Sequence, residues 1–314
     1  NTVVNPMLNT LGGGGNRGNQ LIQLGGSMNS LAATIVPVLV GYLIAGATKA
    51  TIADVNPALY IAMGIFALAF VIILFSAIPE PELEAAKASM AQKEAEEGTF
   101  SLIKGALSHK NLVFGLVAIF LYVGIEVGIP NTMNNFLTTA TDAAQPGFGM
   151  DKGAAGAVVA IYWLLMLVGR LIGGAIGGKV SSRAMISIVS SVAMALIAVG
   201  VLLPGAMVKF PSLDSQTFSF SLVEIPVGVM LFVLCGLCTS VMWGAIFNLA
   251  VEGLGKYTSI ASGLFMVMVC GGGILPLVQG AVVDVAGFMN SYWVLVVALA
   301  YILWFGLAGS RTNK

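Results

Sequence analysis

Hydrophobic residues gather along this chain in long stretches, unlike the short alternating runs of soluble strands or the one-sided stripes of soluble helices. A helix needs about 20 mostly apolar residues to cross a bilayer. Such stretches lie at residues 24–46, 57–79, 111–137, 154–178, 184–204, 226–250, 258–282 and 288–309. The pattern predicts an all-α, polytopic membrane helix bundle.

The first residues continue this hydrophobic pattern and do not resemble a natural N-terminus. Asn1 stands where Met is expected, no basic segment follows, and the apolar residues up to Leu8 are typical of the end of another span. We therefore expect the sequence to begin inside a span. The segment Gly12–Gly15, with Arg17, predicts a short turn before the next one.

Composition supports a membrane protein. Apolar residues make up 58% of the 314, charged residues only 9%, the net charge is zero and the mean hydropathy is +0.95. Such a chain cannot cover a water-facing surface, and its dispersed basic residues exclude nucleic acid as a partner. Three Cys and one His predict no disulfide framework and no metal site. Without a Walker loop or a clustered catalytic set, we expect neither a cofactor nor an enzyme.

Basic residues mark one side of the predicted bundle. Eight spans place on that side Arg17, Lys87, Lys93, Lys104, Lys110, Lys179, Arg183, Lys256, Arg311 and Lys314. The other side has Lys49, Lys152 and Lys209. Because basic loops stay in the cytoplasm, this bias predicts a cytoplasmic C-terminus in a plasma (bacterial inner) membrane.

Two longer connections divide the chain. Residues 80–110 are rich in Glu, Ala and Lys, and predict a cytoplasmic linker with a polar helix at Leu83–Glu97 and an interfacial helix around Phe100–Leu107. Residues 205–224 predict a polar outer loop. We expect residues 1–79 to be part of one half, with the end of a fourth span before the fifth and sixth. Residues 111–314 then form a complete six-helix half, and the protein is a monomer.

Glycine patterns break the rules of soluble helices. Gly169, Gly173 and Gly177 recur every fourth residue and predict close helix packing. The run Gly271–Gly273 with Pro276 predicts a local weakening of its span, as in discontinuous helices that line substrate cavities. Gln279, three residues beyond that proline, is a candidate to point into such a cavity.

Glu126 is the sharpest functional candidate. A carboxylate at bilayer depth is costly unless it is neutral, paired or hydrated, so Glu126 is a candidate proton carrier or acceptor for a sugar hydroxyl. The alternative is a structural hydrogen bond to a neighbouring helix. Asn134 lies about 80° around the same helix and can share one polar sector with Glu126. Asn29 serves either binding or helix packing.

Two further intramembrane positions leave alternatives open. Tyr162 faces either a cavity or the lipid, and periodicity alone does not decide. Arg170 lies about two-thirds along its span, toward the basic side. There we favour a structural charge near the inner mouth over a contact with substrate.

The ordered motifs resemble the major facilitator superfamily and, more narrowly, its fucose–galactose–glucose:proton symporter family. The resemblance rests on Asn5-Pro6, Met28–Leu31, Tyr122–Val127, Tyr162-Trp163, Gly169-Arg170, Gly253–Thr258 and Pro276–Gly280. It implies that the first three and a half spans of the fold are lacking, with 24–46 as the fifth span and 288–309 as the twelfth.

The resemblance also implies roles for single residues. Asn29 matches the family's fifth-span asparagine, and Glu126 matches the seventh-span acid of the glucose/galactose branch. The family's fourth-span acid is Asn1 here, and an amide cannot carry a proton. Gly244 stands where the tenth span usually has a proline.

Together these observations predict a secondary active transporter of a neutral monosaccharide, coupled to protons and working by alternating access. Its sugar site would comprise Asn29, Glu126, Asn134, Tyr162 and Gln279, with Glu126 also coupling protons. The alternatives are a non-sugar solute on the same fold, a facilitative uniporter, or a membrane enzyme or sensor.

Overall fold

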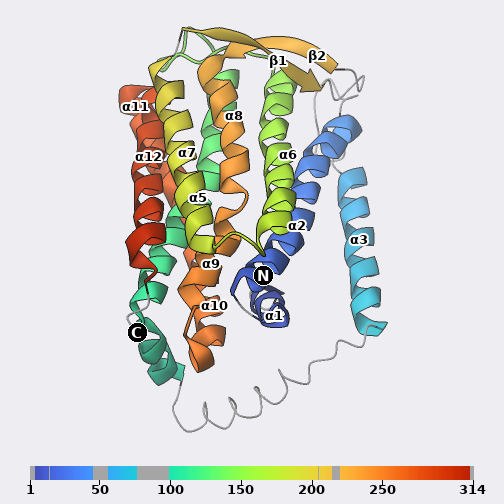
Figure 1. Cartoon of the computed structure of the whole chain (residues 1–314). Helices are drawn as coiled ribbons and strands as arrows, with labels where there is room; N and C mark the ends of the chain where they lie inside the picture. Colours follow the sequence, from blue (N-terminus) through green and yellow to red (C-terminus); the bar gives the residue numbers. More distant parts are fainter. Residues whose placement is uncertain are drawn as a thin grey trace.

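The computed structural model describes residues 4–13, 15–44, 56–75, 99–203, 205–213 and 220–311. These residues form a bundle of helices that carries a β-hairpin over one end (Figure 1). The elements are α1 (Val4–Leu11), α2 (Gly15–Ile44), α3 (Asn56–Phe75), α5 (Lys110–Thr138), α6 (Lys152–Ile176), α7 (Ser182–Leu202), β1 (Met207–Leu213), β2 (Phe220–Pro226), α8 (Val227–Thr239), α9 (Met242–Val251), α10 (Thr258–Met268), α11 (Gly271–Ala286) and α12 (Phe288–Trp304).

The predicted all-α membrane bundle is confirmed. Seven helical segments of the described chain are long and apolar enough to cross a bilayer, namely α3, α5, α6, α7, α8 with α9, α10 with α11, and α12 with the π turn after it. Helix α2 adds 30 residues. Helix α3 lies at the edge of the bundle and has no buried residue, which suits a helix that is apolar all round and surrounded by lipid.

The N-terminal turn is shorter than the sequence predicts. Glycines at 13 and 15 have φ of +70° and +56°, a left-handed backbone that other residues rarely adopt. Helix α2 already begins at Gly15, so Arg17 lies in its first turn. The expected polar helix Leu83–Glu97 lies outside the described residues, whereas residues 99–107 are helical. Phe100 on that helix is 81% exposed, as an interfacial helix requires.

The predicted outer loop at 205–224 is wrong, because most of it forms an antiparallel hairpin. Strand β1 pairs with β2 from Met207↔Pro226 to Leu213↔Phe220. Phe210 and Ile225 are buried against the bundle, while Lys209 and Glu224 face each other on the exposed side. This alternation with a period of two is the strand signal that the polar composition concealed.

Two spans are discontinuous near the middle. The break between α10 and α11 at residues 269–270 adjoins the Gly271–Gly273 run, as predicted. The break between α8 and α9 at residues 240–241 has no such glycine run. Helix α5 instead continues through Pro130.

The predicted glycine packing surface on α6 is confirmed. A Cβ added at Gly174 would meet the Leu24 side chain of α2 at 2.8 Å, and one at Gly177 would lie 3.4 Å from the Gln20 Cα. The side chain of Val241, at the α8–α9 break, presses on Gly173. Missing side chains therefore let α2 and the α8–α9 break approach the C-terminal half of α6 closely.

Candidate functional site

A cavity of about 210 Å³ lies where α1, α2, α5, α6, α9 and α10 meet. Its walls mix apolar side chains with a small set of polar ones. The polar lining residues are Asn5, Gln23, Asn29, Glu126, Arg170 and Trp243. Elements from both ends of the sequence are needed to enclose it.

An ion pair forms one wall of this cavity. Arg170 Nη2 lies 3.2 Å from Glu126 Oε1, and the two side chains are only 8% and 15% exposed. The second terminal nitrogen, Arg170 Nη1, donates to the Gly26 carbonyl of α2 at 2.6 Å. Pairing compensates both buried charges, which alone would be costly at this depth. Arg170 contacts one oxygen of this carboxylate, Oε1, and Glu126 itself lines the cavity.

Local features of α2, α5 and α6 let Gly26, Arg170 and Glu126 come together. Gly26 has no side chain, and a Cβ there would lie 3.2 Å from Arg170 Nη1. Arg170 lies in the glycine-rich part of α6, where α2 approaches closely. Glu126 lies on α5 one turn before Pro130.

Two buried tyrosines lie near Glu126. Tyr162 is fully buried, and its hydroxyl lies 3.0 Å from Thr239 Oγ1 and donates to the backbone carbonyl of Glu126 at 3.3 Å. Tyr122 lies one turn before Glu126 on α5, its ring contacting Trp243 edge-on at 6.2 Å between centroids. Its buried hydroxyl has no hydrogen-bond partner in the described part of the chain.

Two of the five residues predicted to form the sugar site line the cavity, and three do not. Asn29 and Glu126 line the cavity together. Tyr162 lies behind the wall, and Asn134 is half-buried farther along α5. Gln279 is fully buried between helices, where its Nε2 donates to Ser291 Oγ at 3.5 Å and its Oε1 faces Gly128. These last three are not among the residues that line the cavity.

Sequence reasoning missed three lining residues. Arg170 is the partner of Glu126, although we favoured a structural charge near the inner mouth. Trp243 offers an aromatic surface. Gln23 is 2% exposed and donates from Nε2 to the Val241 carbonyl at 2.7 Å, which joins α2 to the α8–α9 break. Only an intramembrane arginine gave a usable signal, because a buried guanidinium requires an anion.

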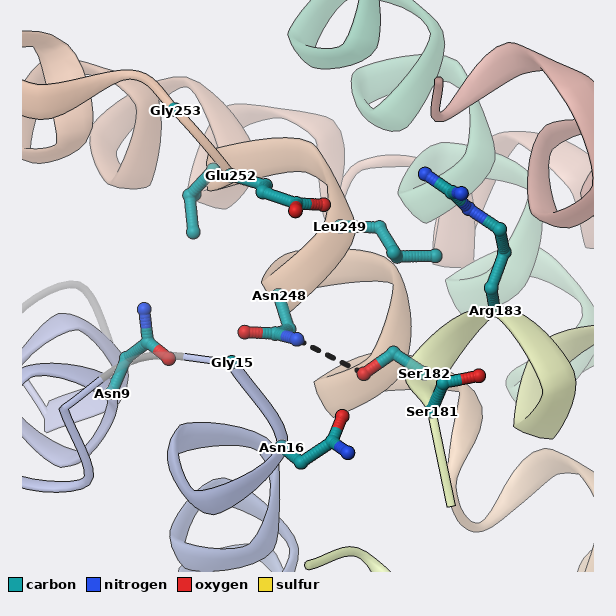
Figure 2. A pocket seen from close by; sticks show the side chains of 11 residues that line it. Asn9, Gly15, Asn16, Ser181, Ser182, Arg183, Asn248, Leu249, Glu252 and Gly253 are labelled. Carbon is teal, nitrogen blue, oxygen red and sulfur yellow. Dashed lines mark hydrogen bonds between the residues drawn. The ribbon is translucent and has the colours of Figure 1, made fainter. Parts of the chain in front are cut away.

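A second cavity of about 460 Å³ lies at the lower end of the bundle. Figure 2 shows amides, hydroxyls and charges around it from the starts of α2 and α7 and the end of α9. Asn248 Nδ2 donates to Ser182 Oγ at 3.0 Å across its floor. Arg183 is turned toward Ser310, donating to its hydroxyl and its carbonyl.

A bundle of partly discontinuous membrane helices around a polar, charge-paired cavity is an architecture typical of membrane transporter folds. The chain belongs to the Major Facilitator Superfamily, whose family model matches residues 19–277. It is 31% identical to a glucose/galactose transporter of Brucella abortus over 91% of this chain and 62% of that protein. It is also 23% identical to the L-fucose-proton symporter of Escherichia coli over 70% of this chain and 44% of that protein.

Solved structures agree on the fold. The crystal structure of the transporter FucP in its outward conformation matches with a TM-score of 0.71 and 19% identity, covering 99% of this chain and 72% of that one. The resemblance to the fucose–galactose–glucose symporter family is therefore confirmed. The chain spans about 62% of the length of the Brucella relative.

Proposed function

We propose that this chain contributes the sugar-binding cavity of a proton-coupled secondary transporter for a neutral monosaccharide. The observation that carries the proposal is the Glu126–Arg170 pair facing the 210 Å³ cavity. A cavity below the usual few hundred Å³ of drug-sized sites favours a small solute. Amides at Gln23 and Asn29 suit hydroxyl groups, and the printed names of the relatives in Brucella abortus and Escherichia coli support a sugar.

Each group has a role in this proposal. The Glu126 carboxylate, which lines the cavity, accepts a sugar hydroxyl or the transported proton, while Arg170 stabilises the ionised form. Trp243 offers a flat apolar surface for the C–H face of a sugar ring. Asn134, Tyr162 and Gln279 remain predicted contributors, with Tyr162 acting through the backbone of Glu126.

The domain and membrane arrangement is part of the proposal. Residues 111–314 form a complete six-helix half, residues 1–79 part of the other half, and 80–110 the linker between them. Lys179, Arg183 and Lys256 lie at the end of α6, the start of α7 and just before α10. This end of the bundle, the lower one in Figure 1, faces the cytoplasm together with the C-terminus. The protein works as a monomer that alternates access between the two sides.

Sugar binding tests the proposal directly. In purified protein of full natural length, hexoses and deoxyhexoses should quench intrinsic tryptophan fluorescence. Trp243→Phe should remove the quenching and weaken binding about tenfold, equivalent to 1.4 kcal/mol. Trp304→Phe is the matched control, because Trp304 packs against Phe114 and Tyr301 away from the cavity. If no sugar binds, the sugar proposal is wrong and the solute belongs to another chemical class.

Transport separates symport from facilitated diffusion. Glu126→Gln should abolish proton-driven accumulation of the sugar in energised vesicles and preserve counterflow exchange, because the amide neither takes up nor releases a proton. Accumulation at the wild-type level would show that Glu126 is not the proton carrier.

A further inference from the structure

Residues 99–107 form a short helix at the lower end of the bundle, before α5, which we call the linker helix (Figure 1). Leu102 and Ala106 are buried against the bundle. Phe100 and Leu107 are instead 81% and 42% exposed. At 100° per residue, these two lie about 20° apart around the helix and at least about 100° from the buried pair. The linker helix therefore turns an apolar stripe, Phe100 with Leu107, away from the bundle.

Tyr257 joins the linker helix to the segment between α9 and α10. Its ring lies against Gly105, where an added Cβ would meet the Tyr257 hydroxyl at 2.6 Å. The rings of His109 and Tyr257 are 5.5 Å apart between centroids, and Lys256 Nζ lies 5.1 Å from the centre of the Tyr257 ring. This aromatic contact brings Lys256 beside the linker helix, although the two are about 150 residues apart in sequence.

Three lysines therefore gather around the apolar stripe. Lys104 lies on the linker helix about 40° around from Phe100, Lys110 begins α5, and Lys256 is held by the Tyr257 contact. All three lysines are exposed. Neither residues 99–112 nor residues 253–262 contain an acidic residue, so the sequence around these lysines offers no compensating charge.

A surface that is both apolar and basic fits the boundary between lipid headgroups and acyl chains. Apolar side chains of an interfacial helix enter that boundary, while lysines reach up to the phosphates. A water-soluble anionic partner, such as the glutamate-rich residues 80–97 of this chain, would match the charge but leave the exposed Phe100 in water. The apolar stripe therefore favours an anionic lipid over a soluble anion.

We propose that the linker helix, with Lys104, Lys110 and Lys256, is a binding site for anionic phospholipid headgroups of the cytoplasmic leaflet. The apolar stripe enters the acyl boundary, and the three lysines bind the phosphate. Because the linker helix leads into α5 and Tyr257 precedes α10, the bound lipid ties the inner ends of both helices to the membrane surface. The sugar site takes no part in this inference, and only the choice of leaflet depends on the proposed orientation.

Quenching by brominated phospholipids measures which lipid lies beside the linker helix. The full-length protein, with its native cysteines replaced, carries Phe100→Cys labelled with bimane. It is reconstituted in vesicles that contain phosphatidylglycerol and phosphatidylcholine in both leaflets, with one of the two brominated in each sample. Val285→Cys, at the C-terminal end of α11 and 87% exposed, is the control label site.

Phosphatidylglycerol should quench the label at residue 100 at least about fivefold more strongly than phosphatidylcholine, which is the effect of a single lysine at an anionic surface. The label at residue 285 should show no preference. Glutamine at Lys104, Lys110 and Lys256 together should bring the quenching ratio at residue 100 close to one, whereas arginine at all three should preserve it.

Lys152→Gln with Lys209→Gln is the matched control for charge, because both lysines are exposed on the other predicted side of the membrane. This variant should keep the parental ratio. If the triple glutamine variant does not elute as a single folded species, Lys104→Gln alone decides instead. That single change should lower the ratio severalfold, and an unchanged ratio counts against the site.

Three results would overturn the inference. One is equal quenching of the label at residue 100 by the two lipids. Another is loss of the preference when soluble glycerol phosphate is added, which would indicate a site for a free anion. The third is a preference that arises only after glutamine replaces the glutamates at 94, 96 and 97, because the chain's own acidic segment would then occupy the surface. Absence of sugar binding would leave each of these readings unchanged.

Discussion

Substitution of Gly236 by alanine tests how closely helix α8 packs against helix α6. Gly236 lies on α8, directly against the backbone of α6. An added Cβ would lie 3.2 Å from both the carbonyl carbon and Cδ2 of Tyr162, and closer still to the carbonyl oxygen. Carbon atoms normally pack about 3.5–4.0 Å apart. The backbone of Tyr162 cannot rotate away from the added Cβ, so α8 has to move away from α6.

The expected cost follows from two losses. Overpacking a close-packed core costs about 1–3 kcal/mol. Separation of the helices also weakens the hydrogen bond between Tyr162 and Thr239, now 3.0 Å, which contributes about 0.5–1.5 kcal/mol. Alanine returns at most about 1 kcal/mol through its helix propensity. We expect Gly236→Ala to lower the free energy of unfolding by about 1–3 kcal/mol.

The matched control is Gly263→Ala on α10, where an added Cβ meets no heavy atom within 4 Å. That variant should be neutral or slightly stabilised. Reversible unfolding of purified protein in mixed micelles, followed by circular dichroism, measures both. If the two variants unfold within about 0.5 kcal/mol of each other, the close packing of α8 on α6 is refuted.

Three other predictions concern the ends and joints of the bundle. Asn111→Ala should cost about 1–3 kcal/mol of unfolding free energy, because its amide donates to three carbonyls at the end of α9. Asn290→Ala loses one exposed bond and should cost less, so equal costs would contradict this account. Gln23→Leu should cost about 1–2 kcal/mol in the same assay through loss of the bond to the α8–α9 break, and unchanged stability would argue against that joint. For orientation, an impermeant maleimide should label Lys209→Cys in intact cells and Lys104→Cys only after permeabilisation, and the reverse pattern would invert the proposed topology.

Candidate site residues show how far sequence reasoning extends. Glu126 and Asn29 stand out because polar groups at bilayer depth need a reason, and both line the central cavity. Arg170 carries the same signal, yet its depth along α6 suggested a role at the inner mouth. Only packing reveals that α5 and α6 bring it to Glu126. Trp243 gives no signal, since an aromatic residue in an apolar span is equally suited to lipid or core.

Of the two helix breaks, one was predictable from the sequence and the other was not. Glycines 271–273 predict the α10–α11 break because they weaken the helix locally. At the α8–α9 break the chain has Ser240 and Val241, which have no such propensity. There Gln23 of α2 donates to the Val241 carbonyl, so a partner distant in sequence supports the interruption.

Sequence alone determined that this chain is a bundle of membrane spans with a carboxylate among them, because hydrophobic length and the cost of intramembrane charge are properties of local segments. Tertiary structure alone decided which polar groups meet. The Glu126–Arg170 pair, the Gly26 carbonyl and the Trp243 ring come from four helices. Their meeting depends on which glycines let those helices touch, and spacing along a single helix does not encode that contact.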